Sequence, residues 1–381
     1  MADRNGFETP GSKPAGIKEI AKALGVSIGT VDRALHGRAG INPLTQAKVL
    51  KMAQTMGYRP NLAARFLKSK RRLQISVQLP LEIATFYDAV RTGIREAAAP
   101  FAPAVHVDFR SHARLGEGDT AVFEQALANG AQGIIIAPGE PALMKPLIRK
   151  AARQNIPVVC VSTDAPGSER LAVVTACPHT SGAMVGELFG RLLHGSGRVA
   201  VFTGGLATED HAQKVKGFHS SLSAFGGGLQ VASVIEAHDN EQLAYTSAKR
   251  LITDNPELRG VYVSTANSLP VLHAIEESGL SGRIAVITTD LFPQLVPLIR
   301  SGRILATIYQ RPDTQGRLAF QALHRFLIEG QCPRPRIRVA PHIVMSSNLD
   351  LFLERIPFDA EQQSELPSEP IWTSGTETMV G

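Results

Sequence analysis

The first part of the chain carries apolar residues at the spacing of a short helix. Ile17, Ile20, Ala21 and Leu24 fall on one side of a helical turn pattern and form a single apolar stripe. Gly25 follows directly, and a residue without a Cβ suits the left-handed backbone that often ends a helix. The pattern therefore predicts a helix that ends at a tight turn.

A second helical segment starts at Ser27, whose hydroxyl suits the N-cap position. Val31 and Leu35 fall on its apolar side. The residues expected to face outward are Ser27, Ile28, Gly29, Thr30 and Arg33. Two helices joined by a glycine turn, the second with a polar outer face, are typical of a helix-turn-helix motif. Because any small helical bundle contains such pairs, this pattern alone leaves both interpretations open.

A third helix and a shorter fourth one follow. Asn42 suits an N-cap and Pro43 the first helical position, so a helix is expected from there to about Met56. Asn61 then suits the cap of a short helix over Asn61–Lys68. An isolated helix of about two turns is unstable in water, because nucleation costs more than so few hydrogen bonds return. This fourth helix is therefore expected to form only when a partner stabilises it.

From residue 73 onward the pattern changes to alternating strands and helices. The segment Leu73–Leu79 alternates strictly between apolar and polar residues, as a half-buried strand does. Further strands are expected at Val105–Phe109, Gly133–Ala137, Pro157–Ser162, Leu171–Thr175, Arg198–Thr203, Gln230–Ile235, Gly260–Ser264, Arg283–Thr288 and Ile304–Tyr309. Helices expected between them include Asp119–Ala128, Leu143–Gln154, Thr180–Leu193 and Leu243–Asp254. This alternation predicts parallel sheets with helices on both faces, and its length predicts two lobes.

These patterns predict an α+β multidomain chain with a three-helix head, a linker and a two-lobed α/β body. The expected parts are a disordered tail at 1–15, a helix-turn-helix domain at 16–58, a linker with a hinge helix at 59–72, a two-lobed ligand-binding domain at 73–356 and a disordered tail at 357–381. The C-terminal tail is polar and lacks a leucine heptad that could build a tetramer, so we expect it to be unstructured.

Charge is distributed unevenly along the chain. Residues 1–72 hold 14 of the 40 Lys and Arg residues but only 4 of the 34 Asp and Glu residues. This segment thus carries a net charge of +10 and the remainder −4, which together give the +6 of the whole chain. A basic head on a mildly acidic body is expected of a domain that neutralises phosphates, although a solvated basic surface has the same composition.

The sequence shows no targeting signal. No apolar run is long enough to span a membrane, and the N-terminus lacks the apolar core of a signal peptide. The cysteines Cys160, Cys177 and Cys332 show no metal-ligand spacing and suit buried thiols in a reducing compartment. We therefore expect a cytoplasmic protein with no bound metal and no membrane partner.

Three linked segments carry a family resemblance. IKEIAKALGVSIGTV, RALHGRAGI and GYRPNLAARFL occur in this order within residues 16–67. In sequence and spacing they resemble the DNA-binding head of the lactose-repressor (LacI) family of bacterial transcription regulators. The resemblance implies a homodimer that binds double-stranded operator DNA and responds to a small-molecule effector.

The resemblance also implies roles for residues of the second helix. Ser27, Ile28, Gly29 and Thr30 lie at its exposed start, with Ile28 and Gly29 expected to face base edges in the major groove. Thr30 and Arg33 are expected nearer the DNA backbone, where contacts position the protein without reading sequence. At residue 32 this chain has aspartate where serine is usual, which would weaken a backbone contact or select a different operator.

The linker helix matches the hinge helix of the family. By resemblance Leu67 is the leucine that wedges into the minor groove and kinks the duplex. Ala64 is small enough to let two copies of the helix approach, and Asn61 caps the helix. A plain tether with one apolar residue is the alternative explanation of this segment.

The body resembles the ligand domain of the same family, which is similar to type I periplasmic sugar-binding proteins with a cleft between two lobes. In open α/β sheets ligands bind beyond the carboxyl ends of the strands. By resemblance Phe86 and Tyr87 sandwich a sugar ring, whose C–H faces are apolar. The further ligand-binding positions implied by the resemblance are Asp164, Lys214, Asn267, Asp290 and Gln310.

Each of these positions also has a plainer explanation. Phe86 and Tyr87 could simply pack against the sheet, and Asp164 and Asp290 could cap helices. In the family an arginine is usual at residue 165, where this chain has alanine, and at Lys214. Lysine presents a point charge instead of a planar guanidinium, so the chemistry of the ligand changes. A sugar or related polyol is expected, and its identity stays open.

Two other classes of protein compete with a regulator. An enzyme on the same α/β body is disfavoured, since the chain has no G-x-G-x-x-G after a strand, no Walker A sequence, no G-x-S-x-G and no H-E-x-x-H. An exported solute-binding protein would share the body, but the basic head argues against it. The sequence therefore predicts a ligand-controlled transcription regulator, a repressor, with no catalytic residue and no cofactor.

Overall fold

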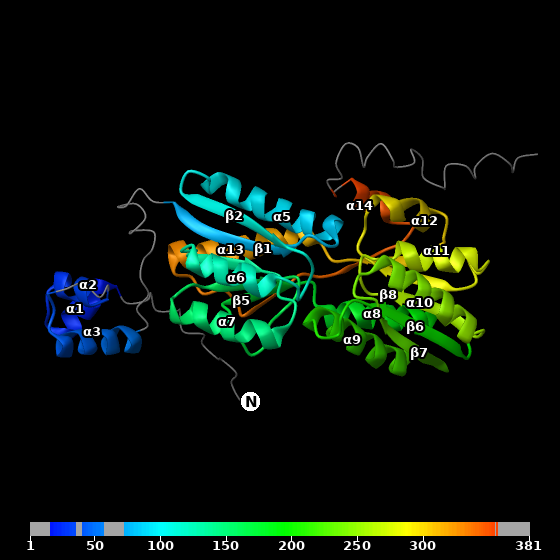
Figure 1. Cartoon of the computed structure of the whole chain (residues 1–381), viewed down its shortest axis with the longest axis horizontal. Coiled ribbons are helices and arrows are strands. Elements are labelled where there is room, and N and C mark those ends of the chain that lie inside the picture. The colour runs from blue at the N-terminus through cyan, green and yellow to red at the C-terminus, as the bar shows by residue number, and fades with distance from the viewer. Residues whose placement is uncertain (1–15, 36–39, 57–71, 355, 357–381) are drawn as a thin grey trace, which may run out of the picture. The chain divides into compact units, whose positions relative to one another are not determined.

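The computed structural model describes residues 16–35, 40–56, 72–354 and 356. These residues form an N-terminal helical head and a larger α/β body (Figure 1). The tails predicted at 1–15 and 357–381 lie outside the described residues, as does the predicted helix Asn61–Lys68 with Ala64 and Leu67.

The head consists of three helices packed on a small apolar core. Their bounds are α1 (Ile17–Leu24), α2 (Ile28–Leu35) and α3 (Pro43–Thr55). Ile20 of α1, Val31 of α2 and Val49 of α3 are fully buried, which shows that each helix directs its apolar side to the same centre. The three-helix arrangement predicted from the apolar stripes is confirmed.

The turn and the helix caps of the head are formed by the residues that the sequence predicted for them. Gly25 has a φ of 62°, in the left-handed region, and its lack of a Cβ permits the turn after α1. The Oγ atom of Ser27 accepts a hydrogen bond of 3.1 Å from the backbone N–H of Thr30. Asn42 caps α3 similarly, since its Oδ1 accepts a bond of 2.8 Å from the N–H of Leu44.

The body contains two sheets, each with six strands among the described residues. The first lobe has the strand order β11-β5-β4-β3-β1-β2, and every neighbouring pair in it is parallel. Its strands are β1 (Leu73–Pro80), β2 (Val105–His112), β3 (Gly133–Ile136), β4 (Val158–Val161), β5 (Ala172–Thr175) and β11 (Arg336–Arg338). The second lobe has the order β12-β10-β9-β8-β6-β7, with β12 antiparallel to β10. Its strands are β6 (Gly197–Thr203), β7 (Leu229–Glu236), β8 (Leu258–Val263), β9 (Ala285–Thr289), β10 (Ala306–Tyr309) and β12 (His342–Val344).

Helices cover the faces of both sheets (Figure 1). The first lobe carries α5 (Ala84–Ala98), α6 (Asp119–Ala128), α7 (Pro141–Arg153) and α13 (Pro312–Glu329), with a short 3-10 turn η1 (Ala99–Phe101). The second lobe carries α8 (Pro178–Leu192), α9 (Glu209–Phe225), α10 (Glu241–Asp254), α11 (Leu269–Glu277), η2 (Pro293–Leu295), α12 (Val296–Arg300) and α14 (Leu349–Leu353). The predicted two-lobed parallel α/β architecture is confirmed. Strands β11 and β12 were not predicted, because each is three residues long and lies in a proline-interrupted segment.

The chain passes between the lobes three times. It leaves the first lobe after β5 to form α8, returns after β10 to form α13, and leaves again between β11 and β12. The first two passages each contain a non-glycine residue with a left-handed backbone, Cys177 with a φ of 46° and Arg311 with a φ of 56°. Each lobe is therefore assembled from segments that are distant in the sequence.

Glycines let two pairs of helices approach to backbone contact. A Cβ on Gly182 of α8 would overlap the carbonyl oxygen of Lys214 in α9, and one on Gly217 of α9 would overlap that of His179 in α8. The first lobe repeats this arrangement between α5 and α13. There a Cβ on Gly93 would overlap the carbonyl of Asp313, and one on Gly316 would overlap that of Val90. Side chains from these helices reach the cleft, so the contacts also position the site.

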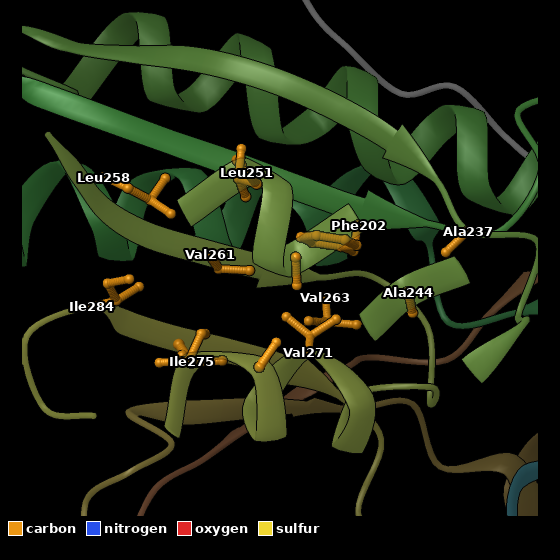
Figure 2. Packing of buried hydrophobic residues seen from close by; sticks show 14 residues of the cluster. Phe202, Ala237, Ala244, Leu251, Leu258, Val261, Val263, Val271, Ile275 and Ile284 are labelled. Atoms are coloured by element: carbon orange, nitrogen blue, oxygen red, sulfur yellow. The ribbon is translucent and has the colours of Figure 1, made fainter. Parts of the chain in front are cut away.

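Each lobe has its own apolar core. In the second lobe one cluster of buried residues lies between the sheet and the helices α10 and α11 (Figure 2). Phe202 of β6, Val261 and Val263 of β8, Val271 and Ile275 of α11 belong to it. Within the described ranges no helix is long and apolar enough to cross a membrane.

Candidate functional site

The outer face of α2 does not pack against the core of the head. Ile28 is 52% exposed, although isoleucine is usually buried, and Gly29 and Arg33 are exposed as well. Thr30 is half-buried, and its Oγ1 lies 2.8 Å from the Oγ of Ser27. This face offers an apolar side chain, hydroxyl groups and a cation side by side, the mixture that reads base edges and phosphates of DNA.

A cavity in the body brings together residues from both lobes. It is lined by Ile83, Phe86, Tyr87, Leu115, Ser162, Thr163, Asp210, His211, Lys214, Thr265, Ala266, Asp290 and Gln310. Most of these residues follow the carboxyl ends of strands, as expected for ligand sites of open α/β sheets. Its free volume is about 30 Å³, room for on the order of one or two water molecules.

Phe86 and Tyr87 form an aromatic wall at the start of α5. Their rings meet edge to face, with centroids 5.1 Å apart and an interplanar angle of 84°. Both side chains are buried and both line the cavity, so packing and ligand contact are compatible here. Burial, assisted by Asp210, raises the pKa of the Tyr87 phenol well above its usual value. The hydroxyl therefore stays protonated and can donate a hydrogen bond.

Asp290 and Gln310 form the polar floor in the second lobe. The Nε2 atom of Gln310 donates to both carboxylate oxygens of Asp290, at 3.1 and 3.0 Å. Burial raises the pKa of Asp290 from 3.8 to about 6, although nearby Lys214 and the bonds from Gln310 oppose this change. At neutral pH the carboxylate is thus charged and accepts hydrogen bonds in a buried site.

Lys214 supplies the cation of the cavity. Its Nζ lies 2.7 Å from Oδ2 of Asp210 one helical turn earlier and donates a 3.2 Å bond to the carbonyl oxygen of Ser264. Burial is the largest effect and would lower the pKa of this ammonium, but Asp210, Tyr262 and Asp290 together outweigh burial and the net change is upward. Lys214 is therefore charged and can donate hydrogen bonds into the cavity.

Two family models match the chain. Residues 16–61 match the bacterial regulatory proteins of the lacI family, and residues 76–331 match the periplasmic binding protein domain. The chain carries the DNA-binding domain of the lacI family of bacterial regulatory proteins. It joins a DNA-binding head to a periplasmic-binding-protein-like ligand domain, as the resemblance predicted.

Similar proteins span nearly the same length. Catabolite control protein A of Priestia megaterium is 23% identical over 327 residues, 81% of this chain and 96% of that protein. The HTH-type transcriptional regulator AglR of Rhizobium meliloti is 25% identical over 341 residues, 88% of this chain and 94% of AglR. A solute-binding protein from Burkholderia graminis in complex with D-arabinose has a TM-score of 0.68 at 23% identity, covering 74% of this chain and 98% of that one. This last likeness concerns the two-lobed fold.

Two predicted ligand residues lie outside the cavity lining. Asp164 forms a two-pronged ion pair with Arg170, in which Nη2 lies 2.7 Å from Oδ2. The guanidinium expected at residue 165 thus comes from six residues after Asp164. Asn267 is half-buried and its backbone N–H donates to Oγ1 of Thr265, which lines the cavity in its place.

Several lining residues were missed from the sequence. Ser162 and Thr163 directly follow β4, and Thr265 follows β8 by two positions, so the strand-end rule could have selected all three. Asp210 and His211 lie in the first turn of α9, and nothing in the sequence pattern distinguishes them from a solvated helix start. The acidic partner of Lys214 was therefore found only in the structure.

Proposed function

We propose that the protein is a homodimeric cytoplasmic repressor whose affinity for operator DNA is set by a sugar or related polyol bound between its lobes. One observation carries the proposal. A single chain combines an exposed recognition face on α2 with a buried polar cavity around Asp290 and Gln310. The D-arabinose complex of the Burkholderia protein, which shares the fold of the body, supports a sugar as the ligand class.

The lining of the cavity suits a polyol. A sugar ring has apolar C–H faces and a rim of hydroxyl groups, and Phe86 with Tyr87 offers a wall for one face. A sugar hydroxyl can donate a hydrogen bond to Asp290 and accept one from Lys214, so both of its hydrogen-bonding roles find a partner in the cavity. We assign supporting roles to Asp164, which is paired with Arg170, and to Asn267, whose backbone N–H donates to Thr265 of the lining.

The small free space of the cavity points to movement of the body on ligand entry. With a free volume of about 30 Å³ in this structure, we propose that side chains or lobes separate to admit a sugar. Because the linker at 59–72 joins the body to the head, a change in the body can alter the placement of the two heads of a dimer. We propose that the hinge helix Asn61–Lys68 forms over the operator centre only in one of these placements.

In the head, Ile28 and Gly29 are assigned to base edges and Thr30 and Arg33 to the DNA backbone. The test is a selection of operators from a random duplex library. The wild-type chain and the double variant Ile28→Thr with Gly29→Ala should select different sequences, because base contacts specify. Arg33→Ala should weaken binding to every sequence by about tenfold and reduce the salt dependence by roughly one phosphate contact.

The body supplies a matched control for the charge. Arg250→Ala removes a side chain that is 86% exposed on α10 and should leave operator affinity unchanged. Selection of the same operator by the wild type and the Ile28/Gly29 variant would overturn the assignment of base contacts. Failure of the wild type to retard any duplex would instead favour a solute-binding role.

A further inference from the structure

A second cavity lies beside the ligand cavity and shares Ser162 and Thr163 with it. Its volume is about 200 Å³, several times the free space of its neighbour. Its other walls come from the strand β11, from the end of β5 and from the first turns of α8 and α9. The space therefore continues the cleft away from the aromatic wall.

Two arginines of β11 line this second cavity. Arg336 and Arg338 are two positions apart on a strand and so project from the same face, and both are exposed. In the described part of the chain neither guanidinium has an ion pair or a hydrogen bond to a side chain. Two adjacent unpaired guanidinium groups form a site that suits an anion with several oxygens, such as phosphate.

The acidic residues of the cavity are largely neutralised. Asp164 is paired with Arg170, and Asp210 is paired with Lys214. Glu209 accepts a 3.0 Å hydrogen bond from Nε2 of Gln213 and is the acidic group there that no cation pairs within the described residues. One carboxylate against two arginines leaves the cavity with a positive surplus.

The shared wall carries unused hydrogen-bonding groups. Ser162 is 7% and Thr163 is 3% exposed, and the hydroxyl oxygen of each has no partner among the described residues. Buried hydroxyl groups normally have partners, so two orphans on one wall require an explanation. A ligand that spans both cavities would place its oxygens next to them.

We propose that the natural ligand is a phosphorylated sugar, whose ring occupies the ligand cavity and whose phosphate is bound by Arg336 and Arg338. This inference rests on the proposed function, because it names the class of sugar that the same cleft accepts. Ser162 and Thr163 lie where the bond between ring and phosphate must pass. Glu209 then opposes the phosphate and limits affinity.

The test compares sugars with their phosphate esters on the full-length chain. Isothermal titration with D-ribose and D-ribose 5-phosphate, D-glucose and D-glucose 6-phosphate, D-glucuronate, and inorganic phosphate covers the ring, the ester and the free ion. At least one ester should bind more tightly than its parent sugar, by on the order of tenfold to a hundredfold. The double variant Arg336→Gln with Arg338→Gln should lose this preference, whereas Glu209→Gln should increase it.

Two controls separate this inference from the proposed function. Arg191→Gln with Arg250→Gln removes the same charge from exposed helix positions and should keep the preference for the ester. Asp290→Asn should weaken parent sugar and ester alike, because it acts on the ring. Tighter binding of every parent sugar than of its ester, or of D-glucuronate than of any ester, would overturn the inference and leave the sugar response standing. Absence of binding by the whole panel would overturn both.

Discussion

Asp290 shows how a single buried carboxyl group couples the site to pH. It is 7% exposed, its two oxygens accept bonds from Gln310, and Lys214 is close enough to favour its charged form. Burial nevertheless dominates and raises its pKa to about 6. Between about pH 4 and pH 6 the folded chain therefore keeps a proton on Asp290 that the unfolded chain has already released.

This difference predicts a measurable pH dependence of stability. Because the folded pKa lies above the ordinary 3.8, the group costs most stability above pH 6, and the cost disappears as the pH falls toward 4. Asp290→Asn has no such proton. Its free energy of unfolding, relative to wild type, should improve by on the order of 2–3 kcal/mol between pH 4 and pH 8. Denaturant titrations at several pH values measure this difference.

An exposed acid provides the reference for that measurement. Asp254 lies on the surface of α10, and Asp254→Asn is the same substitution at an exposed position. A difference from wild type that stays constant with pH for Asp290→Asn would mean that its carboxyl group is not desolvated in solution.

Single residues of the site were predictable where they follow a strand, and unpredictable where their role depends on a distant partner. Phe86, Tyr87, Asp290 and Gln310 follow strands, and all four line one cavity. Lys214 lines it too, but it lies within α9 and was named by the family resemblance. Asp164 also follows a strand but is occupied by Arg170. Which of several strand-end residues faces the cleft depends on side-chain pairing, and pairing across a loop leaves no periodic signal in the sequence.

At the scale of elements, helix pairs in both lobes depend on glycine. Gly93 of α5 contacts the backbone of α13, and Gly182 of α8 contacts the backbone of α9. Neither has a left-handed φ, so these glycines serve close approach and not a turn. The periodic patterns predicted helices here, but a glycine inside a helix pattern indicates only a weaker helix. These positions require glycine because the backbone of the partner helix occupies the space of a Cβ, and the sequence of one helix does not show that.

A side chain at Gly93 should destabilise the contact between α5 and α13. In Gly93→Ala the added methyl group meets the carbonyl of Asp313, a backbone atom that cannot turn aside, so α5 and α13 must separate. We expect a loss of about 2–3 kcal/mol in the free energy of unfolding. Thermal and denaturant unfolding measure it. Glu96→Ala on the exposed side of α5 should change stability little, and an equally small effect of Gly93→Ala would contradict the close approach of the two helices.

Most strands of the body were predictable within a few residues, because a buried parallel strand is a run of apolar residues. The two strands that were missed, β11 and β12, have alternating or half-buried residues and only three positions each. Their assignment depends on pairing with β5 and β10, which are distant in sequence. This omission matters, since β11 carries Arg336 and Arg338 into the second cavity.

At the scale of the whole molecule, the proposed regulation requires the head and the body to communicate through the linker. Leu67 lies outside the described residues, and its role as a minor-groove wedge stays a prediction. Leu67→Gly should reduce affinity for the specific operator by about a hundredfold, because unstacking a base step costs a few kcal/mol that the wedge must offset. Binding to nonspecific duplex and to sugar should change little.

Gel retardation with specific and random duplexes measures these effects, together with a circular-permutation assay for bending. Ser69→Gly changes the same linker without removing an apolar side chain and should bind and bend the operator as the wild type does. If Leu67→Gly does the same, the linker is a tether and the hinge mechanism is wrong for this protein.

The three passages of the chain between the lobes have a consequence for biosynthesis. The first lobe requires α13 and β11, which the ribosome delivers after almost all of the second lobe. A nascent chain that has reached residue 311 therefore exposes the edge of β5 and the glycine face of α5 with nothing to cover them. Such interleaved contacts between distant segments slow folding and prolong the exposure of apolar surface. The lobes cannot mature one after the other, so a chaperone that shields the growing chain has most to protect just before α13 and β11 emerge.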